Sequence, residues 1–238
     1  PPRVCACIRG HTRLAILSRG LGDVYKRQAE SIGRGAEKYA YHVKGVELYG
    51  GDPRGMMGVA LAYAVSMRGG DFTSVYPVPE FRYTAEQAEQ EFGTRDVIDF
   101  TATGGKGAMV KKCMIVSSVI DSLGLCKVPA LSIIGDFSLE MEARLIQAIT
   151  GLDVSPAALY LIGERIVHME KIFNIHQGGN PDDDSLPALF LQSPIDKGPI
   201  QGRKVNLAPM VQEFYQSMGW DEDGQPTQNI LQKFDLSE

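Results

Sequence analysis

The residues Asp121–Cys126, Asp-Ser-Leu-Gly-Leu-Cys, place a carboxylate, a glycine and a thiol on one short stretch of chain. An aspartate at the end of a helix can accept hydrogen bonds from N–H groups of a ligand, and Gly124 allows a positive φ and a close approach of the backbone. The thiol of Cys126 is a suitable ligand for a soft metal. Such a stretch could hold a cofactor with an amide edge on one side and a soft metal on the other.

The same stretch also has a purely structural interpretation. Asp-x-x-Gly is a common helix C-terminus, and free cysteine is among the most often buried residue types. Spacing alone favours this structural interpretation. The choice between the two therefore depends on the rest of the chain.

Composition excludes several classes of protein. The chain has 238 residues, of which 44% are hydrophobic and 22% charged, so it can build a real core. Its net charge of −5 and its scattered basic residues argue against nucleic-acid binding. The longest strongly apolar stretch, Met56–Met67, is too short to cross a bilayer. Four cysteines are too few for a disulfide scaffold, which favours the reducing cytoplasm.

Residues 1–28 differ from everything that follows. They are rich in arginine, have no helical or alternating period, and end in Val-Tyr-Lys-Arg-Gln, which looks like translated sequencing-adapter read-through. We therefore expect this segment to be non-native and leave it out of the fold prediction. Cys5, Cys7 and His11 within it would make a poor tetrahedral metal site, because two ligands one residue apart have no second pair.

Residues 29–238 carry successive helical patterns, with no repeat or linker that would divide them. The sequence therefore predicts one mainly α, irregular multi-helix unit. A short extended piece is expected at 46–49. Helices are expected over 29–43, 56–67, 84–92, 108–122, 138–150, 156 to about 178 and 207–218, followed by a short last helix capped by Thr227.

Two features of these helices are specific enough to test. Thr84 and Gln87 have the spacing of a capping box. In the long helix after Ser155 and Pro156, five apolar residues share one face: Leu159, Ile162, Ile166, Met169 and Phe173.

The loop Arg68–Asp71 follows the apolar 56–67 helix and contains two glycines. A simple helix end needs only one glycine, so a polar loop that starts deep in the core is a candidate for contact with a ligand. A structural role for both glycines remains the alternative.

Three other motifs carry less chemistry. Gly104–Gly107 lacks the Ser or Thr and the glycine spacing of a phosphate-binding loop, so these glycines are expected to open the next helix. Asp182–Asp184 has no glutamate at a calcium-ligand spacing and is expected to be a solvated loop. Cys113 is expected in the core.

The order of the motifs resembles the aldehyde ferredoxin oxidoreductase family of tungsten and molybdenum pterin enzymes. The resemblance covers residues 29–238, and its motifs occur in the family's order. The matching pieces are residues 29–48, Asp-Pro-Arg-Gly at 52–55, Ala-Tyr-Ala at 62–64 through Arg-Gly-Gly-Asp at 68–71, the 121–126 stretch, Gly-Glu-Arg-Ile at 163–166, Asp-Ser-Leu-Pro at 184–187, and Gly-Trp-Asp at 219–221 with Gly-Gln-Pro-Thr at 224–227.

The resemblance implies the C-terminal portion of a longer enzyme. Members of the family begin with a β-rich domain that cradles a tungsten or molybdenum bis-pterin, and a middle segment supplies three of the four cysteines of a 4Fe-4S cluster. The implied reaction oxidises an aldehyde to a carboxylic acid and passes two electrons to ferredoxin in the cytoplasm of an anaerobe. The fragment alone is expected to be inactive.

The resemblance also assigns site residues. It makes Cys126 the fourth cluster ligand and places Asp121 and Leu125 at one pterin. Gly124 and Lys127 are further cofactor-binding candidates of the same stretch. Arg68 and Asp71 are the cofactor-binding candidates of the preceding loop. Many relatives carry a histidine directly after Arg-Gly-Gly-Asp, where this chain has Phe72, so the substrate is open and no catalytic residue is assigned.

Three alternatives stay open. An aromatic acyl-CoA reductase catalytic subunit shares the fold, and a non-catalytic helical scaffold would need neither Asp121 nor Cys126. A nucleotide-binding role for Gly104–Gly107 is opposed by its missing Ser or Thr. A second copy of the chain is a further candidate partner, because full-length relatives are often homodimers.

Overall fold

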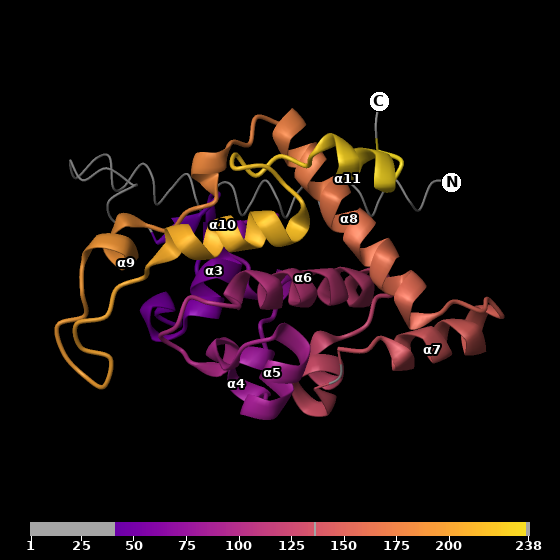
Figure 1. Cartoon of the computed structure of the whole chain (residues 1–238), viewed down its shortest axis with the longest axis horizontal. Helices are drawn as coiled ribbons and strands as arrows, with labels where there is room; N and C mark the ends of the chain where they lie inside the picture. The colour runs from indigo at the N-terminus through magenta and orange to yellow at the C-terminus, as the bar shows by residue number, and fades with distance from the viewer. Residues whose placement is uncertain (1–40, 136, 237–238) are drawn as a thin grey trace, which may run out of the picture. The chain divides into compact units, whose positions relative to one another are not determined.

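The computed structural model describes residues 41–135 and 137–236. The description concerns the compact unit of residues 42–238. Figure 1 shows this unit as a set of packed helices. A small sheet pairs β1 (His42–Val43) with β2 (Val46–Glu47) in antiparallel register. The described part is mainly helical, as the sequence predicts.

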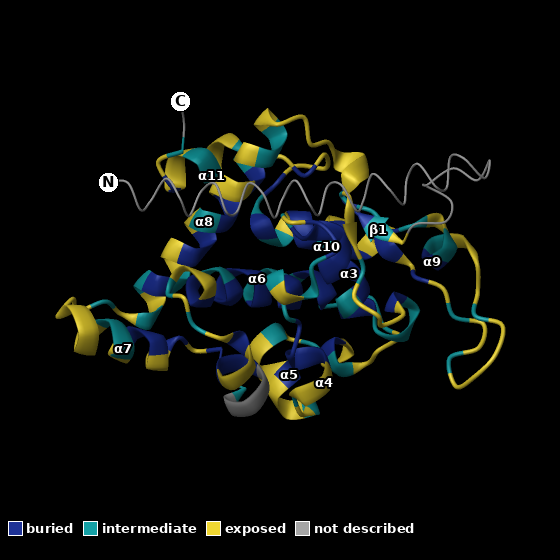
Figure 2. Ribbon diagram, turned by 180° about the vertical axis from the view of Figure 1, so that it is seen from behind, coloured by how far each residue is buried: buried dark blue, intermediate teal, exposed yellow. Residues whose placement is uncertain are grey.

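The helix α6 (Lys106–Ser122) runs through the middle of the unit (Figure 1). It packs against α3 (Met57–Val65), α8 (Pro156–His176) and α10 (Leu207–Met218). Every residue of α3 except Val59 is buried, and Figure 2 shows α3 largely in the colour of buried residues. Burial on all sides confirms the expectation for this apolar helix.

The remaining elements are short or peripheral. They are η1 (Pro53–Gly55), η2 (Phe72–Ser74), α4 (Pro79–Arg82), α5 (Ala85–Phe92), η3 (Arg95–Ile98), the π-helical η4 (Val128–Ile134), α7 (Glu140–Thr150), η5 (Pro181–Asp183), α9 (Ala188–Gln192) and α11 (Gln228–Lys233).

Local capping signals predicted helix ends well. The Thr84 and Gln87 side chains and backbones form the expected reciprocal capping box at the start of α5. Ser155 Oγ accepts from Ala158 N at the start of α8, with Pro156 in the first turn. Both devices act within four residues, so sequence alone suffices to recognise them.

The helix expected over residues 29–43 lies mostly outside the described residues. Its last two positions are wrong, because His42–Val43 is strand β1. Lys44 and Gly45, both with positive φ, form the two-residue turn of a hairpin. This turn geometry matches the twist of the two strands and so favours the hairpin over a continued helix.

The apolar face expected on α8 is mostly uncovered. Leu159 is buried, whereas Ile162, Met169 and Phe173 are exposed. The buried side of α8 instead carries Gly163, Glu164, Val167, His168 and Lys171. Periodicity identifies which residues share a face, but it does not tell which face the rest of the protein covers.

Two charged groups whose burial the sequence did not predict lie in the interior. Lys106, from the glycine-rich stretch, has no exposed surface and pairs with Glu80 at 2.8 Å. Asp184, expected in a solvated loop, is only 6% exposed, although its neighbours Asp182 and Asp183 are exposed. The expectation for Asp184 was wrong because its partners lie elsewhere in the chain.

Among the residues that the structure describes, no helix is both long enough and apolar enough to span a membrane. Cys5, Cys7 and His11 lie outside these residues.

Candidate functional site

The end of α6 has the geometry that positions the Asp121–Cys126 stretch. Gly124 has φ +69°, Leu125 N donates to Ile120 O at 3.1 Å, and Gly124 N donates to Asp121 O at 3.0 Å. This is a Schellman motif, in which a left-handed residue closes the last helical turn. The helix-end interpretation of the stretch is therefore correct, and it leaves Asp121 and Cys126 exposed at the surface.

Four of the residues proposed to bind a cofactor lie together and form what we call the Arg68 cluster: Arg68, Asp71, Asp121 and Lys127. Lys127 Nζ lies 2.7 Å from Asp121 Oδ2, and Arg68 Nη2 lies 3.3 Å from the same oxygen. Arg68 Nη2 also lies 3.2 Å from Asp71 Oδ2. The cluster thus joins the loop after α3 to the end of α6, although Arg68 and Asp121 are 53 positions apart.

Lys127 is the buried member of the cluster. Its Nζ also donates to Thr73 O, and burial lowers the pKa of its ammonium group while Asp121 opposes this shift. A cation that is half desolvated and shared between a carboxylate and a carbonyl is held in one position. It therefore fixes one oxygen of Asp121.

Two glycines are needed in the Arg68–Asp71 loop for a structural reason. A Cβ on Gly69 would lie 2.5 Å from Val43 O, and one on Gly70 would lie 2.6 Å from Val46 O. Gly70 N also donates to Val43 O at 3.1 Å. The hairpin therefore supports this loop through direct backbone contact, which only glycine allows.

The two described cysteines differ in environment. Cys126 is exposed, whereas Cys113 is fully buried in α6, where desolvation strongly raises the pKa of its thiol. Cys113 is thus a core residue, as expected. Cys126 is the described thiol available to a metal, and the described residues contain no group of three or more His, Cys, Asp or Glu that could bind one.

A pocket of about 150 Å³ lies beside the Arg68 cluster. Its polar lining residues are Arg68, Ser74, Ser118, Asp121, Ser122 and Glu170. Sequence reasoning missed Glu170 on α8, together with Ser74 and Ser118. For Glu170 the sequence did contain a signal. Glu170 is four residues from Ile166 and four from Asn174, which places all three on one side of α8.

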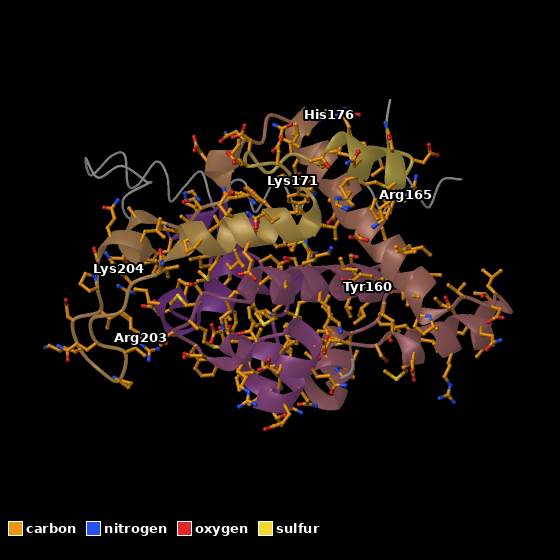
Figure 3. All side chains as sticks on the ribbon, viewed as in Figure 1. Tyr160, Arg165, Lys171, His176, Arg203 and Lys204 are labelled. Carbon is orange, nitrogen blue, oxygen red and sulfur yellow. The ribbon has the colours of Figure 1, made fainter. Side chains whose placement is uncertain are left out.

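A second group of charged residues lies next to the end of α3, just before the Arg68–Asp71 loop. Asp184 lies 2.5 Å from Lys44 Nζ and 2.9 Å from Lys171 Nζ, and Tyr215 Oη donates to it at 2.6 Å. Burial alone would raise the pKa of Asp184, but the two lysines hold it below its usual range. Figure 3 shows Lys171 on the side of α8 that faces α10. Lys44 Nζ also donates to Ser66 O, just before Arg68, so this group anchors the end of α3.

Phe72, the residue directly after Asp71, belongs to an aromatic group. Its ring centroid lies 5.2 Å from that of Tyr76, 6.1 Å from that of Tyr49 and 6.4 Å from that of Tyr63. Burial raises the pKa of Tyr63 to about 12. The surroundings of residue 72 are therefore apolar and aromatic.

The family model and similar curated proteins point to the same family. The model of the family described as "Aldehyde ferredoxin oxidoreductase, domains 2 & 3" matches residues 13–236. The tungsten-containing aldehyde ferredoxin oxidoreductase of Pyrococcus furiosus is 33% identical over 226 residues, which cover 92% of this chain and 35% of the relative. The aliphatic sulfonate oxidoreductase WOR-like subunit of the same organism is 25% identical, over 94% of this chain and 32% of its own length. The chain thus spans about a third of the curated relatives it matches.

Among solved structures, the fold is similar to the active site complex BamBC of benzoyl coenzyme A reductase, which was solved with 1,5-dienoyl-CoA. The TM-score is 0.59 at 18% identity, and the match covers 87% of this chain and 34% of that chain. This likeness shows a shared fold.

Proposed function

The chain belongs to the aldehyde ferredoxin oxidoreductase family, and from this premise we propose that it is the C-terminal, cofactor-binding portion of an aldehyde-oxidising enzyme. The enzyme would hold a tungsten or molybdenum bis-pterin and a 4Fe-4S cluster, and would pass two electrons to ferredoxin in the cytoplasm of an anaerobe. The β-rich domain and the other three cluster cysteines would belong to the part of the relatives that this chain does not span.

The residues present fit these groups. Cys126 offers an exposed thiol, which suits iron. Asp121 has one oxygen engaged by two cations, while its side chain is 43% exposed and its Oδ1 has no partner among residues 41–135 and 137–236. Cys126 would bind the cluster, and Asp121, Gly124, Leu125 and Lys127, with Arg68 and Asp71 opposite, would bind a pterin.

When bound, the metal pterin and the cluster supply the two-electron oxidation and the path to the acceptor. The protein's own part is positioning. Arg68 and Lys127 hold the Asp121 carboxylate from two sides, so it meets N–H donors of a ligand without reorganising. Asp121 and Cys126 lie on one loop, which keeps the pterin and cluster ligands close together.

The single observation that carries this proposal is the pairing of an exposed Cys126 with a fixed Asp121 at the end of one helix. The test uses the full-length protein, produced anaerobically, with Cys126→Ala compared with Cys113→Ala. The first variant should lose cluster iron and the electron paramagnetic resonance signal of the reduced cluster, and the second should keep both. Equal iron in the two variants would contradict the proposal.

The aromatic surroundings of Phe72 favour a second candidate, an aromatic acyl-CoA reductase catalytic subunit. A substrate panel separates the two. Aldehyde-dependent reduction of a viologen dye supports the first, and activity confined to aromatic acyl-CoA substrates supports the second.

We also propose that residues 1–28 are adapter-derived and that a β-rich domain precedes residue 29 in the native gene. The family match begins at residue 13, which speaks against an adapter origin for residues 13–28. The genomic DNA upstream of codon 29 tests both points. A reading frame that continues into a domain with three closely spaced cysteines supports the proposal, and a stop and a start codon just before Ala29 would contradict it.

A further inference from the structure

The pocket beside the Arg68 cluster has walls from three separate segments. Arg68 and Ser74 come from the loop after α3, Ser118 and Asp121 from α6, and Glu170 from α8. Hydroxyl, guanidinium and carboxyl groups therefore meet around about 150 Å³ of space. A ligand in this space has a hydrogen-bonding group on each wall.

Two carboxylate side chains line this pocket, Asp121 and Glu170, and of these Glu170 has no ion-pair partner among the described residues. Within the Arg68 cluster, the two cations pair with Asp71 and Asp121. Glu170 forms no ion pair or hydrogen bond with any residue of 41–135 or 137–236. Desolvation raises the pKa of Glu170, the Arg68 guanidinium opposes the rise, and the Asp121 carboxylate adds to it. Glu170 is nevertheless exposed, so water reaches its carboxyl group, and a ligand with N–H donors would take the place of that water.

The position of Glu170 is set by packing of α8 against the loop after α3. Ile166, Glu170 and Asn174 are four residues apart and lie along one side of the helix. Ile166 lines the same pocket, and Asn174 Nδ2 donates to Met67 O at 2.9 Å. Contacts one turn before and one turn after Glu170 therefore hold it at the edge of the site.

We propose that Glu170 is a further binding residue of this site, whose carboxyl group accepts hydrogen bonds from a ligand edge with adjacent N–H donors. The inference rests on the proposed function, in which the ligand is a pterin and its aminopyrimidinone edge places an amine beside a ring N–H. Asp121 Oδ1 is the second acceptor for such an edge. Arg68 lies in the same pocket and can donate to acceptor atoms of the same ring.

The test compares cofactor release from the full-length holoenzyme and three variants. Glu170→Ala removes the carboxyl group, Glu170→Gln keeps one carbonyl acceptor, and Glu140→Gln makes the same chemical change at an exposed carboxylate on α7. Release in dilute denaturant is followed by the fluorescence of the oxidised pterin and by tungsten content. Glu170→Ala should release the pterin roughly tenfold faster or more, Glu170→Gln should fall between it and wild type, and Glu140→Gln should match wild type.

Each outcome bears on a different statement. Equal release from Glu170→Ala and Glu140→Gln overturns this inference and leaves the proposed function intact. Faster release accompanied by a lower thermal midpoint of the cofactor-free protein assigns Glu170 a structural role and also overturns it. A wild-type holoenzyme without pterin overturns the proposed function, and this inference with it.

Discussion

Two of the charged clusters in the described part of the chain differ in how completely their polar atoms are used. In the first, Glu80 and Lys106 have fully buried side chains 2.8 Å apart. Glu80 also accepts from Gly58 N and Val59 N, and Lys106 donates to Val97 O and Asp99 O. In the Arg68 cluster, by contrast, the Arg68 side chain is 51% exposed and Asp121 Oδ1 has no partner among the described residues.

This difference separates a structural role from a binding role. The Glu80–Lys106 pair satisfies the first N–H groups of α3 and joins them to the start of α6, so nothing is left for a ligand. In the Arg68 cluster, Asp121 lines a pocket and its Oδ1 has no partner among the described residues. A buried polar group with every hydrogen bond made holds the fold, whereas fixed groups with spare capacity can bind.

The largest expected effect follows from breaking the enclosed pair. Lys106→Met removes the cation and leaves the Glu80 carboxylate buried without its charge partner. Breaking a buried ion pair on one side costs about 3–5 kcal/mol, so the free energy of unfolding should fall by that amount. Denaturant unfolding of the purified protein measures it.

The matched control for this change is the double variant Glu80→Gln with Lys106→Met. Because it removes both charges, it should recover part of the lost stability. If the single and double variants are equally destabilised, the loss comes from packing and not from the uncompensated charge.

His168 is a second buried polar group, and its protonation should make the stability of the protein depend on pH. His168 has no exposed surface, its Nδ1 accepts from Trp220 Nε1 at 3.0 Å, and its Nε2 has no partner among the described residues. Burial lowers the pKa of His168 to about 4 from 6.5. The unfolded chain therefore binds this proton first, so stability is fully present above pH 6.5 and is lost as the pH falls toward 4. The total from this group is about 3 kcal/mol.

Unfolding followed by the fluorescence of Trp220, the single tryptophan of the chain, checks this expectation. The control is His168→Gln, which keeps an acceptor for Trp220 but does not titrate. Between pH 6 and 4.5 the free energy of unfolding should fall less steeply for His168→Gln than for wild type. The two slopes should differ by about 1.4 kcal/mol per pH unit. Parallel curves for the two proteins would assign the acid sensitivity to other groups.

Around both the Arg68 cluster and the Glu80–Lys106 pair, the sequence predicted local features and missed the partners that are distant in the chain. The Schellman end at Gly124 and the capping box at Thr84 depend on residues within a few positions, so their patterns are sufficient. Lys106 pairs with a residue 26 positions away, and Lys44 with one 140 positions away. No local pattern encodes such pairs, which is why the burial of Lys106 was not predicted and Asp184 was placed in a solvated loop.

The site shows the same division. Asp121, Gly124 and Cys126 stand out from their own spacing, whereas Arg68 and Asp71 were joined to them through the family resemblance. Glu170 was missed because its spacing of four from Ile166 and Asn174 shows which residues share a side of the helix, but not which element that side faces. Its relevance appears only when α8 is packed against the loop after α3.

A smaller effect is expected at the turn that presents the site. Gly124 has φ +69° and open space around its Cα, so Gly124→Ala meets no clash and its cost is backbone strain alone. The left-handed conformation costs a residue with a Cβ about 1–2 kcal/mol. Thermal unfolding should show this loss, and Gly124→Asn should lose less because Asn tolerates this conformation better. Equal losses for Ala and Asn would indicate a cause other than backbone strain.

The smallest effect on stability, and the sharpest test of the comparison, is expected from Asp121→Asn. Its ion pair with Arg68 is largely exposed, and the amide oxygen of Asn can still accept from the buried Lys127 Nζ, so the free energy of unfolding should change by about 1 kcal/mol or less. The pterin content of the full-length protein should nevertheless fall, because the carboxylate that meets the ligand is gone. The matched control is Asp52→Asn, since Asp52 also pairs with an arginine, Arg54, and is 36% exposed. It should show a similar small stability change and normal pterin content. A large stability loss in Asp121→Asn with unchanged pterin would place the Arg68 cluster with the Glu80–Lys106 pair, as a structural element.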